Sequence, residues 1–145
     1  MGAAKLSPER LVGKVEAGTQ NANIWLTRFN AAYARKLGMP VFPGSLNLRL
    51  PHAFDWTDPR YARALIRFDR SEYGGERDIL FLPCRLESLE GRPGFLWTTT
   101  TPRQGADQDL VEIVADIPLR ATFGLKDGDL LAVELVLGDR SGGVA

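Results

Sequence analysis

Apolar and polar residues alternate along much of the chain, and this pattern predicts a series of short strands. Residues 11–18 (LVGKVEAG) and 45–50 (SLNLRL) alternate in this way, with the period of a strand that buries one face. Four further stretches, rich in β-branched and other apolar residues, also predict strands: 78–89, 94–101, 109–115 and 130–137. Prolines and glycines separate most of these segments and mark the turns between them.

One segment, residues 30–38, predicts the single sizeable helix, with Asn30 as its N-cap and Gly38 as its C-terminal stop. Residues 60–68 fit either a short helix or a strand, and residues 118–124 predict one helical turn. Roughly six short strands with one main helix predict a mostly-β fold, a small barrel.

The bulk composition fits one globular domain, and we expect residues 1–145 to form it, with a frayed tail over 138–145. Eighteen basic and eighteen acidic side chains cancel, so the chain offers no general electrostatic attraction for nucleic acid or an anionic membrane. We therefore expect no nucleic-acid and no membrane partner. The oligomeric state is left open.

The numbers of cysteine and histidine residues limit which disulfides and metal sites the chain can form. Cys84 is the only cysteine and His52 the only histidine, so no internal disulfide can form and the usual zinc ligand sets are missing. No apolar stretch is long enough for a signal peptide or a membrane span, and we expect a cytoplasmic protein. The three tryptophans are expected to pack in the core: Trp25, Trp56 and Trp97.

The hexapeptide PGSLNL (43–48) combines a turn with the start of a strand. Alternation places Ser45 and Asn47 on the opposite face from the leucines, about 7 Å apart at the Cα atoms. Hydroxyl and amide oxygens are hard ligands that suit Mg²⁺ when substrate phosphates complete its shell. The alternative is a half-exposed strand whose polar face binds nothing.

The same stretch carries a resemblance. FPGSLNLRL (42–50) resembles the PGTLNL signature of the archaeal CTP-dependent riboflavin kinases, and residues 109–135 resemble the C-terminal half of that family. The similarity extends from about Gly13 to Leu137, and two motifs in the right order are more specific than either alone. It implies a six-stranded cradle-loop barrel in which Asp127-Gly128-Asp129 is a structural turn.

The resemblance also implies an activity: Mg²⁺-dependent transfer of the CTP γ-phosphoryl group to riboflavin, which gives FMN and CDP. By match to the family motifs, Ser45 and Asn47 would bind the metal, whereas Glu112 and Gln104 would contact the flavin. No catalytic residue is assigned, although Glu112 is a weak candidate for the general base. The residues matched to nucleotide contacts form two segments: Gly18, Thr19, Gln20, Asn21, Ala22 and Asn23, then Ile117, Pro118, Leu119 and Arg120.

Two departures from the family pattern bear on this hypothesis. The family's first loop has the form G-x-G-x-G, but Gln20 and Ala22 stand in the second and third glycine places, where a close backbone approach to phosphate would be hindered. Gln104 stands where the family has a threonine. The alternative function is therefore a barrel that binds a nucleotide or flavin without catalysis, having lost its glycine-rich loop.

Overall fold

A computed structural model describes residues 9–18, 22–100 and 108–137, without the side chains of Ala22, Asn23 and Trp25. The tail predicted to fray, 138–145, lies outside the described residues, and the single-domain assignment stays a prediction.

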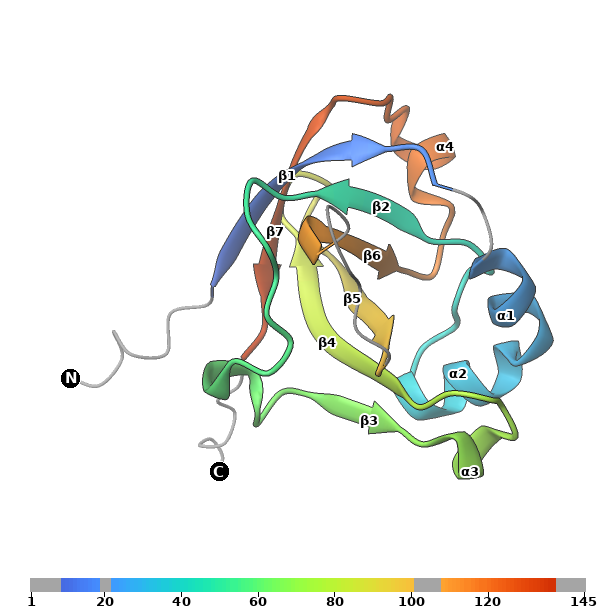
Figure 1. Cartoon of the computed structure of the whole chain (residues 1–145). Coiled ribbons are helices and arrows are strands. Elements are labelled where there is room, and N and C mark those ends of the chain that lie inside the picture. The colour runs from blue at the N-terminus through green and yellow to red at the C-terminus, as the bar shows by residue number, and fades with distance from the viewer. Residues whose placement is uncertain (1–8, 19–21, 101–107, 138–145) are drawn as a thin grey trace.

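Short antiparallel strands dominate the described part of the chain (Figure 1). They run in the order β3-β4-β5-β6-β2-β1-β7, and an additional pairing of β4 with β7 closes the sheet. β5 follows one edge of β4 along its length, whereas β3 and β7 share the other edge, at Ile79–Phe81 and Cys84–Arg85. The strands are β1 (Arg10–Glu16), β2 (Leu46–Arg49), β3 (Ile66–Phe68), β4 (Ile79–Leu86), β5 (Arg92–Thr99), β6 (Leu110–Val114) and β7 (Leu130–Leu135).

This topology confirms the predicted six-stranded barrel, with β3 as an extra strand outside it. The ambiguous segment 60–68 resolves into a 3₁₀ turn at Pro59–Tyr61 followed by β3. Asp58 starts this turn by accepting a hydrogen bond from the Arg60 amide.

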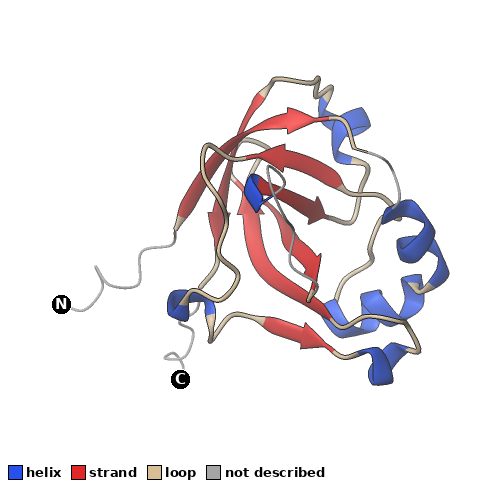
Figure 2. Cartoon of the chain, viewed as in Figure 1, coloured by secondary structure: helices blue, strands red, loops and turns tan. Residues whose placement is uncertain are grey.

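Helices are short in the described ranges and lie around the barrel (Figure 2). They are α1 (Ala22–Arg28), α2 (Asn30–Leu37), α3 (Arg70–Tyr73) and α4 (Leu119–Phe123). α2 is the predicted main helix, and Gly38 ends it in the left-handed conformation, with φ 74°. None of the helices in the described ranges is long and apolar enough to cross a membrane.

The predicted N-cap of the main helix is wrong. Phe29 occupies the N-cap position and Asn30 is the first helical residue. The Asn30 amide instead donates to the backbone oxygen of Val41 at 2.7 Å. α1 comes directly before this point, so Asn30 continues a helical path, and its side chain serves a tertiary contact that a local capping rule does not see.

Two apolar clusters stabilise the barrel. The first fills its interior with inward-facing side chains from all six barrel strands, among them Leu48, Leu82 and Leu96, none of which is exposed. The second lies on the outside, where α1 and α2 cover part of the sheet, and includes Leu26, Tyr33, Phe81 and Trp97. α1 and α2 therefore cover one part of the outer surface of the sheet, and another part carries polar side chains such as Asn47 and Arg49.

Candidate functional site

β2 presents its polar side chains on the outer face of the barrel. Leu46 and Leu48 are 2% and 0% exposed, whereas Ser45, Asn47 and Arg49 are only half-buried. The structure therefore confirms the alternation read from the sequence. β2 lies between β1 and β6, and this arrangement places Asn47 opposite Glu16 on one side and Glu112 on the other.

Ser45 and Glu112 are hydrogen-bonded although they are 67 residues apart in the sequence. The Ser45 hydroxyl donates to Glu112 Oε1 at 2.9 Å in a partly buried setting. A hydroxyl has one hydrogen to donate and two lone pairs, so this bond leaves the Ser45 oxygen able to accept a cation. The hydrogen bond therefore connects Ser45, which matches a metal ligand in the family motif, with Glu112, which matches a flavin-contacting residue.

Gly18 lies against Asn47. A Cβ atom on Gly18 would come within 2.2 Å of Asn47 Nδ2, but 3.4 Å from Oδ1. This distance is too short for a real Cβ atom, so any larger residue at position 18 would have to displace the Asn47 amide. The backbone of the first candidate nucleotide segment therefore reaches the strand that carries the candidate metal ligands.

The second nucleotide segment lies on the other side of Ser45. Ser45 and Gly44 line a hollow of about 250 Å³ together with residues 117–121, which include the first turn of α4. Arg120 in this turn binds the Asp127 carboxylate at 2.7 Å. The structure thus brings residues 117–120 beside the PGSLNL stretch, as the sequence match requires.

The turn after α4 is structural, as the resemblance implies. Gly128 has φ 91°, which favours glycine, and Asp129 accepts a hydrogen bond from the Lys126 amide at 2.8 Å. Asp127 instead pairs with the Arg120 side chain. One aspartate therefore stabilises the turn, and the other forms a surface ion pair with α4.

Arg49, the second polar residue of β2, joins strands on both sides. Its guanidinium donates to both carboxylate oxygens of Glu16 and to Asp109. The hydrogen bonds from Arg49 to Glu16 lower the pKa of the Glu16 carboxyl. Because its donors are engaged with two carboxylates, Arg49 serves to fix β1, β2 and the start of β6 around Asn47.

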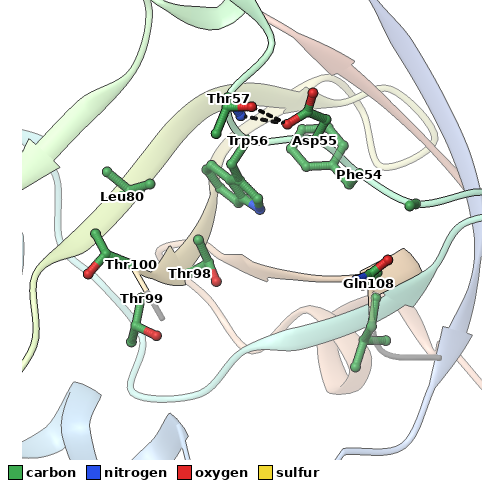
Figure 3. Close-up of a pocket in the computed structure, with 11 residues that line it drawn as sticks. Phe54, Asp55, Trp56, Thr57, Leu80, Thr98, Thr99, Thr100 and Gln108 are labelled. Carbon is green, nitrogen blue, oxygen red and sulfur yellow. Dashed lines mark hydrogen bonds between the residues drawn. The ribbon is translucent and has the colours of Figure 1, made fainter. Parts of the chain in front are cut away.

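A hollow of about 460 Å³ was not predicted from the sequence. Figure 3 shows its lining: the loop that contains Phe54 and Trp56 on one side, with Thr98–Thr100 and Gln108 across from it. Asp55 stabilises this loop by accepting hydrogen bonds from the Thr57 amide and hydroxyl, at 2.9 and 2.6 Å. Trp56 packs against the interior cluster, as expected, but it is only partly buried and also lines this surface hollow.

Several predicted site residues cannot be located. Thr19, Gln20, Asn21 and Gln104 lie outside the described residues. The backbones of Ala22 and Asn23 form the start of α1, so the segment matched to the glycine-rich loop ends in a helix. No sequence signal indicated this helix, because residues 23–29 are a short apolar run without a capping motif.

The protein is a closed antiparallel β-barrel, and the oxygen donors gathered on one outer face form a candidate site for a nucleotide and a metal ion. A family model for the CTP-dependent riboflavin kinase domain, described as domain of unknown function DUF120, matches residues 15–135. The chain belongs to this family, as the sequence resemblance predicted.

Curated relatives agree with the family match. A riboflavin kinase of Archaeoglobus fulgidus is 27% identical over 88% of this chain and 55% of its own length. One from Pyrobaculum aerophilum is 28% identical over 88% of this chain and 61% of its own length. The chain therefore spans less than two thirds of these longer relatives. A riboflavin kinase of Aeropyrum pernix is 30% identical over 86% of this chain and 93% of its own length.

Proposed function

We propose that this protein is a kinase that transfers the γ-phosphoryl group of CTP to the terminal ribityl hydroxyl of riboflavin, giving FMN and CDP. Family membership and relatives named riboflavin kinase support this assignment. The observation that carries it is the hydrogen bond between Ser45 and Glu112 beside Asn47. It joins residues matched to metal and flavin at one point on the barrel.

The donors on β2 suit a magnesium ion. The Ser45 hydroxyl and the Asn47 amide oxygen would hold it, because both are hard oxygen donors on one face of the strand. Such an ion would neutralise charge on the nucleotide phosphates and align them. The Asn47 amide nitrogen, not the oxygen, is nearer to the position that a Cβ atom on Gly18 would take, so the oxygen is the atom turned further from Gly18.

The two nucleotide segments approach this point from different directions. Gly18 comes from the end of β1, and residues 117–120 come from the end of β6. CTP would lie along these segments, with its phosphates toward Ser45 and Asn47. The substitutions at Gln20 and Ala22 remove two glycines from the first segment, so more of the phosphate contact would fall to Gly18 and the β2 side chains.

Glu112 is the candidate acceptor for the proton of the ribityl hydroxyl. In the transfer, the acceptor oxygen forms a bond to the γ-phosphorus, the bond from that phosphorus to the bridging oxygen breaks, and CDP leaves. The hydroxyl proton would pass to the Glu112 carboxylate. Ser45 holds this carboxylate by its hydrogen bond at 2.9 Å, and Gln104 would add a flavin contact.

A direct assay tests the proposal. The purified protein is incubated with riboflavin, Mg²⁺ and CTP, ATP, GTP or UTP in turn, and FMN is measured by chromatography. We expect FMN with CTP and at least about tenfold less with ATP, a discrimination that a few hydrogen bonds to the base supply. Equal rates with all four nucleotides would contradict the CTP assignment. Flavin binding without FMN from any nucleotide would favour the non-catalytic barrel.

A further inference from the structure

Two carboxylates lie beside the candidate metal ligand on the outer face of the barrel. Glu16 of β1 is directly opposite Asn47 of β2, and its side chain is 40% exposed. Asp109 comes just before β6, next to the residue that pairs with Arg49. Neighbouring strands are about 4.8 Å apart, which is less than the Debye length of about 8 Å at physiological ionic strength. Carboxylates in these positions would therefore repel the phosphates of a nucleotide bound at Asn47.

Arg49 binds both of these carboxylates. Its Nε and one terminal nitrogen donate to the two oxygens of Glu16, at 3.0 and 2.6 Å. Its other terminal nitrogen donates to Asp109. A two-point contact between a guanidinium and a carboxylate fixes the direction of both groups. One positive charge therefore faces two negative charges in this cluster of three side chains, and it turns the Glu16 carboxylate toward itself.

The place of Arg49 on β2 links this cluster to the site. Arg49 follows Asn47 by two residues on the same face of the strand, and its side chain is 27% exposed. Ion pairs that are partly open to solvent contribute little to stability. Coulomb interactions with a highly charged ligand act over several ångströms. We therefore expect the main effect of this cluster to be on the binding of a charged ligand, with a smaller effect on the stability of the barrel.

We propose that Arg49 is a positioning residue for nucleotide binding. It holds the carboxylates of Glu16 and Asp109 and cancels part of their charge, so that the outer face of the barrel accepts a polyphosphate at Asn47. This proposal rests on the proposed function. Arg49 acts through the two carboxylates, since the hydrogen bonds to them engage all three nitrogens of its guanidinium.

The test compares Arg49→Gln, Glu16→Gln and the double variant, each titrated with CTP and Mg²⁺ in a calorimeter. Arg49→Gln leaves two carboxylates without their cation, and we expect the Kd for CTP to rise about tenfold. Glu16→Gln removes one carboxylate and keeps the cation, so the Kd should fall about threefold. The double variant removes one charge of each sign and should return to within about twofold of the wild type.

Arg10→Gln is the matched control. Arg10 lies at the other end of β1, where it pairs with Glu87 at 2.9 Å. About 20 Å of strand separates it from Glu16, so this variant removes the same charge beyond the range of screening. Its Kd for CTP should equal that of the wild type. Added salt should reduce the difference between Arg49→Gln and the wild type, because screening weakens the repulsion.

A purely structural role predicts a different pattern. If Arg49 only holds the strands together, Glu16→Gln also weakens CTP binding and the double variant binds no better than Arg49→Gln. That result would overturn the proposal. Tighter CTP binding by Arg49→Gln would overturn it as well, because the released Glu16 would then attract the metal more than it repels the phosphates.

The outcomes also separate this inference from the kinase assignment. If the wild type forms FMN from CTP while all the variants bind CTP equally well, the role of Arg49 is wrong and the kinase stands. If the Kd values follow the expected pattern but no nucleotide gives FMN, the role of Arg49 stands without the kinase. A wild type that does not bind CTP overturns both.

Discussion

At the scale of single residues, the candidate site consists of polar side chains that three neighbouring strands hold close together. Ser45 holds Glu112, Gly18 leaves room for the Asn47 amide, and Arg49 fixes the neighbouring carboxylates. Each of these contacts joins residues that are far apart in the sequence. Substitutions here are therefore expected to change activity much more than stability.

Asn47→Ala tests the metal site. The side chain is half-buried on the outer face, so its loss is expected to change the free energy of unfolding by no more than about 0.5 kcal/mol. FMN formation is expected to fall on the order of 100-fold, because an oxygen ligand that orients the phosphates is lost. The control Val12→Ala, on the exposed face of β1, should keep both. Full activity in Asn47→Ala would refute the metal assignment.

Gly18→Ala tests the contact between the first nucleotide segment and β2. The added methyl group must displace the Asn47 amide, because it would stand 2.2 Å from Nδ2. We expect FMN formation to fall about tenfold, and the effect to be non-additive with Asn47→Ala, since contacting residues couple. The measurement is kcat/KM for Gly18→Ala, Asn47→Ala and the double variant. Independent, additive effects would indicate that Gly18 acts elsewhere.

At the scale of elements, β2 has two faces with separate tasks. Its leucines belong to the interior cluster, and its polar side chains belong to the candidate site. The strand pairs with both β1 and β6 along nearly its whole length. The barrel therefore fixes the position of β2, and this in turn fixes where its polar side chains lie.

Leu48→Ala tests this division. The side chain is 0% exposed, and truncating a fully buried leucine is expected to cost roughly 2–5 kcal/mol of unfolding free energy through lost burial and a cavity. Urea unfolding followed by circular dichroism measures the cost. Leu130→Ala on β7, where the leucine is 68% exposed, is the matched control and should cost less than about 0.5 kcal/mol. Similar costs for both variants would contradict the interior position of Leu48.

At the scale of the whole molecule, the closed barrel buries groups that would titrate freely in an unfolded chain. Cys84 of β4 is 2% exposed in the interior cluster. Burial raises the pKa of its thiol from 9.0 to about 12. Burial also raises the pKa values of the Tyr33 and Tyr61 hydroxyls. All three groups favour their protonated form in the folded state.

The barrel is therefore expected to lose stability in alkali. The unfolded chain releases the Cys84 proton above pH 9.0, while the folded chain keeps it until about pH 12, so the stabilisation is complete below pH 9.0 and declines above it. Urea unfolding at pH 8 to 11 should show a steeper decline for the wild type than for Cys84→Ala. Parallel declines would show that this thiol ionises equally in both states.

The sequence by itself determined the strand pattern and therefore the class of fold. Alternation over 45–50 fixed which face of β2 is buried, because side chains on a strand alternate whatever the tertiary context. Gly38 and Gly128 fixed the ends of local elements, because left-handed backbone favours glycine. Matched motifs also named Ser45, Asn47 and Glu112 before any spatial arrangement was known.

Only the tertiary structure decided how these residues meet. The Ser45–Glu112 hydrogen bond, the contact of Gly18 with Asn47 and the hollow shared with residues 117–120 depend on the β1-β2-β6 pairing. Pairing between strands that are far apart in the sequence produces no repeating pattern of residues that could be recognised in the sequence. For the same reason, the sequence could not show that Asn30 contacts Val41 rather than capping a helix. These positions are set by packing among distant segments, which a local pattern does not encode.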